Sequence, residues 1–174
     1  MRLYKDRNFE NAELFTDVYK VELIDDVIYE VEGETVTERF DSTQVNTGAN
    51  ASAEEPDEAG DVQSTTGPNF VSACQLKLLE SKFTKKEFLV YLKAYLKTLV
   101  FPEDRKAELQ KKIENYMKTK VLPNFKNFDQ YVGKDLIVDL EDTPYPMICL
   151  LNYREDTDKP YMVVFKHGLT EENL

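Results

Sequence analysis

The stretch Thr84-Lys85-Lys86-Glu87 marks the point at which the pattern of this sequence changes from strand to helix. The Thr84 hydroxyl can accept a hydrogen bond from the Glu87 amide, and the Glu87 carboxylate can accept one from the Thr84 amide. This reciprocal capping box starts a helix. Apolar residues then recur at the spacing of one helical face, at Phe88, Leu92, Tyr95, Leu96 and Leu99.

A second helix is predicted directly after the first. Phe101-Pro102 ends the first helix, and Pro102-Glu103-Asp104 starts the second with acids at its positive end. Pro123 stops this helix. Its apolar stripe consists of Leu109, Ile113, Tyr116 and Met117. Because the link between the helices is short, residues 83–122 are predicted to form an antiparallel helical hairpin.

Strand patterns lie on both sides of the hairpin. Residues 18–23 alternate between apolar and polar, and residues 27–31 form a β-branched run. Residues 70–79 also read as a strand. After the hairpin, strands are predicted at residues 136–138, 147–151 and 161–165. Strands and helices segregated in this way define an α+β fold, with residues 1–174 as a single domain.

Residues 41–68 interrupt the strand pattern. They are rich in Ser, Thr, Asn, Gly, Ala and acids, with five acids among the eight residues 54–61. Such a stretch buries too little apolar surface to offset its ordering entropy. We therefore expect a mobile acidic loop at 41–68.

Composition bounds the class of protein. A chain of 174 residues with 41% apolar content can build its own core without disulfides. The two cysteines, Cys74 and Cys149, are too few for a stapled scaffold and indicate a reducing compartment. The sequence shows no apolar run of signal-peptide or membrane-spanning length, so we expect a cytoplasmic protein without membrane insertion.

Charge is segregated along the chain. The net charge of −11 argues against nucleic acid as the main ligand, because phosphate backbones require clustered cations. Residues 82–126, however, hold 12 Lys plus Arg against five acids, whereas the rest holds 10 against 28. A chain divided in this way can bind two kinds of partner, or its halves can screen each other.

Residues for catalysis are scarce. His167 is the only histidine and is expected in a surface turn, and neither cysteine belongs to a CxxC pair, so no zinc site is predicted. The scattered glycines form no phosphate-binding loop, and hence no nucleotide site is expected. Cys149 lies in an apolar run and is predicted to be core, although a redox role for it is an alternative.

Several motifs together resemble one family. They are residues 48–56 (GANASAEEP), 153–155 (YRE), 165–169 (FKHGL), 4–6 (YKD), 15–20 (FTDVYK) and 25–31 (DDVIYEV). In this order, end to end, they resemble the translationally controlled tumour proteins, also called histamine-releasing factor or fortilin. The resemblance implies a small, twisted, tent-like, mainly antiparallel sheet with a projecting helical hairpin. It also implies a non-enzymatic protein with growth-control and anti-apoptotic partners, some members of which leave cells by unconventional secretion.

The resemblance implies weak calcium binding. Asn50 matches the family's position in the acidic loop, and Asp129 matches the second position with a carboxylate in place of the usual amide. Carboxylate and carbonyl oxygens are the ligands that calcium prefers, but no EF-hand spacing is present. Two acidic clusters fit the same chemistry, namely Asp57, Glu58 and Asp61, and Glu155, Asp156 and Asp158. A solvated acidic surface is the alternative.

The resemblance also implies that the hairpin binds tubulin and microtubules. Lysines that lie mostly off the apolar stripes could meet the acidic tails of tubulin. The residues assigned to this contact are Lys93, Lys97, Lys111 and Lys112. The alternative is that these lysines only solvate two amphipathic helices.

Glu13 occupies the position at which the family contacts a Ras-family small GTPase. A carboxylate near a nucleotide site can compete for the magnesium ion or its phosphate-binding lysine, and can thereby loosen the nucleotide. Guanine-nucleotide exchange through Glu13 is therefore the main alternative to a purely binding role. In the simpler interpretation, Glu13 is one more acid in an acidic segment.

Overall fold

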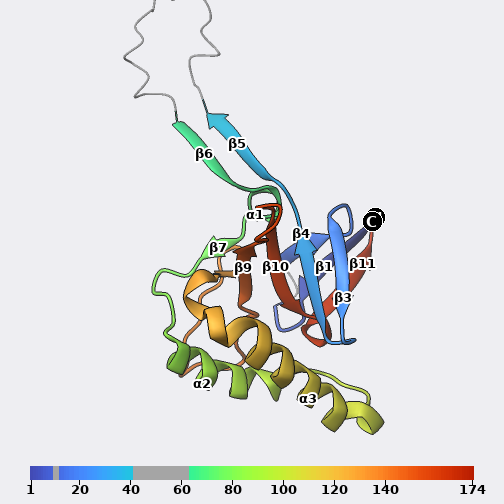
Figure 1. Ribbon diagram of the computed structural model, residues 1–174. Coiled ribbons are helices and arrows are strands. Elements are labelled where there is room, and N and C mark those ends of the chain that lie inside the picture. Colours follow the sequence, from blue (N-terminus) through green and yellow to red (C-terminus); the bar gives the residue numbers. More distant parts are fainter. Residues whose placement is uncertain (10–11, 41–62) are drawn as a thin grey trace, which may run out of the picture.

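The computed structural model describes residues 1–9, 12–40 and 63–174 (Figure 1). Its largest sheet has six strands in the order β3-β4-β10-β9-β8-β7, and each neighbouring pair is antiparallel. The strands are β3 (Lys20–Ile24), β4 (Ile28–Glu32), β7 (Lys77–Leu78), β8 (Asp129–Val132), β9 (Cys149–Tyr153) and β10 (Pro160–Phe165). The strands predicted around residues 18–31, 147–151 and 161–165 are thus confirmed.

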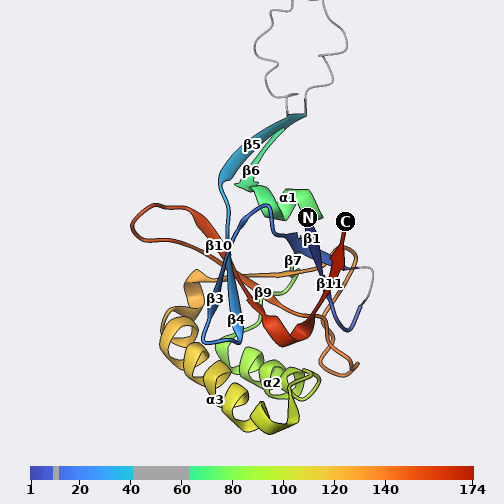
Figure 2. The ribbon, with the colours of Figure 1, turned by 90° about the vertical axis from the view of Figure 1, so that its right-hand side faces the viewer.

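A second sheet joins the two ends of the chain. Its order is β11-β1-β2, with β1 (Arg2–Asp6) between β2 (Glu13–Thr16) and β11 (Leu169–Asn173). Arg2 pairs with Asn173 in the register of β1 and β11, so the termini lie close together (Figure 2). Strands β5 (Thr35–Phe40) and β6 (Gln63–Pro68) form a separate ribbon that extends away from the body.

The predicted helical hairpin is present. Helix α2 (Lys85–Leu96) carries the full capping box, with the Glu87 amide donating to Thr84 Oγ1 and the Thr84 amide donating to Glu87 Oε1. The return path consists of the 3-10 turn η4 (Glu103–Arg105), α3 (Lys106–Tyr116), the π-helical turn η5 (Met117–Val121) and the 3-10 segment η6 (Leu122–Asn127). Both views place the hairpin at the end of the body opposite the β5–β6 ribbon (Figures 1 and 2).

Three predicted elements differ from the structure. Residues 69–74 form a short helix, α1 (Asn69–Cys74), instead of a strand, and only β7 remains of the strand expected at 70–79. Residues 136–138 are not a strand, and β8 lies earlier in the chain. Residues 63–68 of the expected acidic loop form β6, while residues 41–62 lie outside the described part of the chain.

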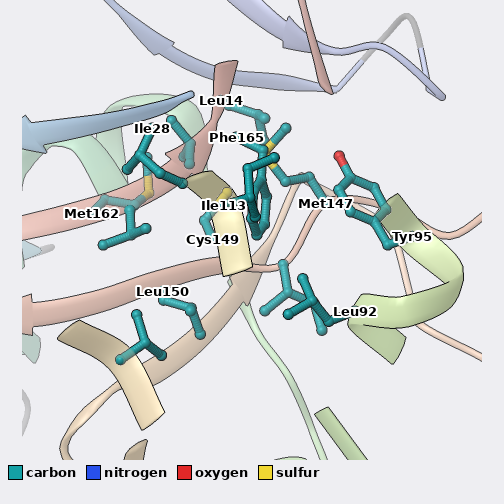
Figure 3. Packing of buried hydrophobic residues seen from close by; sticks show 14 of the residues in the cluster. Leu14, Ile28, Leu92, Tyr95, Ile113, Met147, Cys149, Leu150, Met162 and Phe165 are labelled. Carbon is teal, nitrogen blue, oxygen red and sulfur yellow. The ribbon is translucent and has the colours of Figure 1, made fainter. Parts of the chain in front are cut away.

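The core lies between the sheets and the hairpin. Central strands β9 and β10 bury nearly every apolar side chain, because the sheet is covered at these positions. Figure 3 shows Cys149 and Met162 of the sheet packed with Ile113 of α3 and Leu92 of α2. Each such side chain stabilises the fold by about 1.5–3 kcal/mol through burial. The observed segregation of strands and helices confirms the α+β prediction.

A buried charge cluster ties the hairpin to this sheet. Glu30 of β4 is 6% exposed and accepts a hydrogen bond from Tyr116 Oη at 2.6 Å. Arg154 Nη1 donates to Glu30 Oε1 at 2.8 Å, its Nε donates to Glu32, and its guanidinium lies 4.0 Å from the ring centroid of Tyr161. Each polar group therefore has a partner, as burial of a charge requires.

Candidate binding surfaces

Helix α2 presents a row of cations to solvent. Lys86, Lys93 and Lys97 follow each other at intervals of seven and four residues, which places them on one helical face. All three are exposed, and none forms an ion pair with a described carboxylate. We call these three residues the α2 lysine face.

The other two lysines assigned to tubulin lie apart from this face. Lys112 of α3 forms an ion pair with Glu108 at 3.1 Å, and Glu108 also binds Arg105 at 3.1 Å. Lys111 is exposed and has no described carboxylate partner. The structure therefore brings Lys93 and Lys97 together, leaves Lys111 free and engages Lys112 within its own helix.

A shallow groove of about 310 Å³ runs between the two helices beside the α2 lysine face. Leu89, Leu92 and Leu96 supply its apolar part, and Gln110 and Glu114 of α3 form the opposite wall. Lys93 and Lys97 also line it. Lysines thus lie next to an apolar wall whose exposed part is Leu89, and apolar surface rimmed by polar groups is typical of the places where proteins bind partners.

Glu13 begins β2, an edge strand of the three-stranded sheet. Its side chain is exposed and forms no ion pair with a described cation. Helix α1 packs against β2, and burial together with the Glu13 carboxylate raises the pKa of Cys74 to about 11. Because the Glu13 side chain is exposed and has no described ionic partner, it is accessible to another protein, as the assignment to a GTPase contact requires.

Of the two residues that the resemblance assigns to calcium, one is described. Asp129 is exposed at the start of β8, whereas Asn50, like the cluster of Asp57, Glu58 and Asp61, lies outside the described residues. The acidic cluster of Glu155, Asp156 and Asp158 is described as well and lies exposed in the turn between β9 and β10. No group of three His, Cys, Asp or Glu suited to a metal ion occurs within the ranges that the structure describes. Since calcium takes six to eight oxygen ligands, these ranges do not make a site by themselves, and weak calcium binding stays a prediction.

The thiols are poor nucleophiles. Cys149 is fully buried, and burial raises its pKa far above the ordinary value for a thiol. The pKa of Cys74 is raised as well. Since the thiolate is the reactive form, these shifts argue against the redox alternative and agree with the prediction that Cys149 is a core residue.

His167 is half-buried, whereas the sequence pattern predicts that it is exposed in a surface turn. It lies in the 3-10 turn η7 (Lys166–Gly168), and its ring packs against Phe101 with centroids 4.8 Å apart. Burial lowers its pKa, and its Nδ1 atom is buried without a hydrogen-bond partner. Packing of this ring therefore favours its neutral form over the imidazolium.

None of the helices in the described ranges has the length and apolar character needed to cross a bilayer.

Taken together, the geometry defines an α+β protein with antiparallel sheets and a basic helical hairpin. Its notable polar groups are exposed cations and an exposed carboxylate.

Comparison with known proteins identifies the family. The family model described as "Translationally controlled tumour protein" matches residues 1–170. A translationally controlled tumour protein homologue from Branchiostoma belcheri is 36% identical over 181 residues, and one from Yarrowia lipolytica is 35% identical over 179 residues. Each alignment covers 100% of both chains. This chain belongs to the translationally controlled tumour protein family.

Solved structures agree with this assignment. The translationally controlled tumour-associated protein of Schizosaccharomyces pombe matches with a TM-score of 0.74 and 35% identity, over 100% of both chains. A family member from Caenorhabditis elegans matches with a TM-score of 0.64 over 100% of this chain and 99% of that one. Because the latter is 23% identical, it supports the fold alone.

Proposed function

We propose that this chain acts by binding rather than by catalysis, and that the α2 lysine face binds an acidic partner. The observation that carries the proposal is the distribution of ion pairs. Outside the hairpin, many cations are neutralised by carboxylates, as in Arg2–Glu171, Arg154–Glu30 and Lys166–Asp26. On the α2 lysine face no lysine is paired with a carboxylate of the described residues, although the chain as a whole carries a net charge of −11.

The family resemblance names tubulin as the acidic partner. Unpaired lysines on a rigid helix attract an acidic tail at long range, and the apolar groove beside them adds contact area once the tail has bound. Lys111 can extend the contact onto α3. Lys112 contributes less, because its pairing with Glu108 must be given up first.

Co-sedimentation with microtubules tests this proposal. The double variant Lys93→Glu/Lys97→Glu should weaken binding by about tenfold or more, because two attractions become repulsions. Lys20→Glu/Lys134→Glu makes the same change of charge at two exposed lysines elsewhere on the molecule and should bind like the wild type. Equal weakening by both doubles would show a response to net charge alone and would overturn the proposal.

Nucleotide exchange on a Ras-family GTPase is the second candidate, favoured by the free, exposed carboxylate of Glu13 on an edge strand. Substoichiometric amounts of this chain should then accelerate release of labelled GDP, and Glu13→Gln should abolish the acceleration. Glu22→Gln, at an exposed acid of β3, is the matched control. If the GTPase binds this chain but GDP release stays at its intrinsic rate, the exchange function is excluded and the contact is that of an adaptor.

A further inference from the structure

The open end of the hairpin, where the chain enters α2 and leaves η6, holds a hollow of about 710 Å³. Residues 82–85 form one wall and residues 122–127 the other. We call this the basal hollow. Its volume is in the range of sites that take up a ligand or an anchoring side chain. It shares no residue with the α2 lysine face.

The floor of the basal hollow is apolar. Phe83, Leu122 and Phe125 line it, and Phe125 packs on Phe88 of α2 with ring centroids 5.2 Å apart. The ring of Phe125 is therefore fixed by its contact with the buried core residue Phe88. Phe83 and Leu122 are only partly buried, and so they keep apolar surface in contact with water. Covering this surface with an apolar side chain is favourable.

The walls of the hollow are fixed by hydrogen bonds. The side chain of buried Gln130 holds the backbone of Phe83 at both polar groups, since the Phe83 amide donates to Gln130 Oε1 and Gln130 Nε2 donates to the Phe83 carbonyl, each at 3.0 Å. The capping box fixes Thr84, and Lys82 Nζ donates to the Lys126 carbonyl at 3.2 Å. The hollow is thus formed in advance, so a ligand loses little binding energy in ordering it.

The rim of the hollow is cationic. Lys82, Lys85 and Lys126 line it, and no carboxylate of the described residues does. None of the three lysines forms an ion pair with an acid in the part of the chain that is described. On a protein with a net charge of −11, three unneutralised cations around an apolar floor select for a ligand that carries negative charge and an apolar body.

A second hollow of about 250 Å³ lies next to the first and shares Phe83 with it. Its lining includes Leu78 and Ile137, which are 53% and 68% exposed, and the ion pair of Lys77 with Glu80. Two neighbouring hollows that share one phenylalanine and each expose apolar side chains suit an extended chain with two spaced anchors better than one compact small molecule.

We propose that the basal hollow binds an acidic, extended peptide segment of a partner protein, with one bulky apolar side chain on Phe83 and Phe125 and a second over Leu78 and Ile137. The lysine rim receives the carboxylates of the segment. This site goes beyond the α2 lysine face, and either surface can fail without the other.

A fluorescein-labelled peptide of nine residues, glutamate except for phenylalanine at its third and seventh positions, is the probe. Fluorescence anisotropy should show saturable binding to the full chain. Lys82→Glu/Lys126→Glu should weaken binding by about tenfold or more, equivalent to about 1.4 kcal/mol. Lys106→Glu/Lys118→Glu changes the charge equally at exposed lysines of the hairpin outside the hollow and should stay within about twofold of the wild type.

The probe with serine in place of both phenylalanines should also bind about tenfold more weakly, since it loses the apolar anchors. In an amide NMR titration, the largest shifts should fall on Phe83, Asn124 and Asn127. Absence of saturable binding, equal weakening by the two lysine doubles, or indifference to the phenylalanines would each overturn the proposal. Unchanged unfolding midpoints would show that the exposed substitutions leave the fold intact.

Discussion

The Asp6 side chain is fully buried, and this burial favours the protonated form of its carboxyl group. It accepts backbone hydrogen bonds from Met147 at 2.7 Å and Asn8 at 3.0 Å. Burial is nevertheless the larger influence and raises its pKa to about 6. The folded state therefore favours the neutral acid. The stability that this supplies is full below the unfolded pKa of about 4 and is lost as the pH rises through 6.

Asp6→Asn should remove this dependence on pH. Between pH 4 and 7 the free energy of unfolding of the wild type should fall by about 2.3 kcal/mol relative to the variant, because the pKa differs by about two units between the folded and unfolded states. Urea unfolding across this range measures the difference. Asp129→Asn, at an exposed acid, is the control, and parallel profiles for wild type and Asp6→Asn would refute the assignment.

Tyr116→Phe should destabilise the protein by about 1.5–3 kcal/mol, because it removes a hydrogen bond to a buried carboxylate that then keeps only Arg154. Chemical denaturation should show a lower midpoint at an unchanged slope. Tyr153→Phe removes the same hydroxyl at an exposed position and should change little. Similar midpoints for the two variants would mean that the Tyr116 hydroxyl contributes no net stability.

Among the elements, the hairpin could be predicted from the sequence because the signals that define it lie within the hairpin itself. The capping box and two apolar stripes lie within residues 83–122, and nothing distant is needed to interpret them. Helix α1 was missed because six residues with one buried side chain, Phe70, show no clear period. Its end at Gln75, which adopts a left-handed backbone conformation with a φ of 55°, carries no glycine signal.

Strand β8 was missed because one of its two buried residues, Gln130, is polar, and the other, Val132, is its last residue. Gln130 points inward between Asp129 and Tyr131, and it is satisfied by the backbone of Phe83, 47 residues earlier in the chain. A sequence pattern with glutamine at a position that faces the core predicts a loop, unless the hydrogen-bond partner of the glutamine is known. Such a partner follows only from the tertiary structure.

Thr84→Ala should lower the free energy of unfolding by about 1 kcal/mol, the usual contribution of a helix cap, because the Glu87 amide loses its acceptor. Hydrogen exchange should report faster opening of the first turn of α2. Ser81→Ala, three residues earlier, has no capping role and serves as the reference. If both variants unfold at the same denaturant concentration, the capping box is not a source of stability.

For the molecule as a whole, composition along the chain predicted that cations are concentrated in the hairpin. It did not predict how they are shared between surfaces. The pairing of Glu108 with Lys112 could have been read from their spacing of four residues on α3, which would have removed Lys112 from the tubulin-binding set. The basal hollow had no such signal, since its two walls come from residues about 40 positions apart in the chain.

We infer that the unpaired lysines on α2 enable this protein to bind an acidic partner. The most direct test is the affinity for microtubules measured across a series of salt concentrations, for the wild type and for Lys93→Glu/Lys97→Glu. On this inference, wild-type binding should weaken steeply as salt screens the charges, and the double variant should bind more weakly and respond less to salt. Affinity that does not change with salt, or equal salt dependence for both proteins, would contradict it.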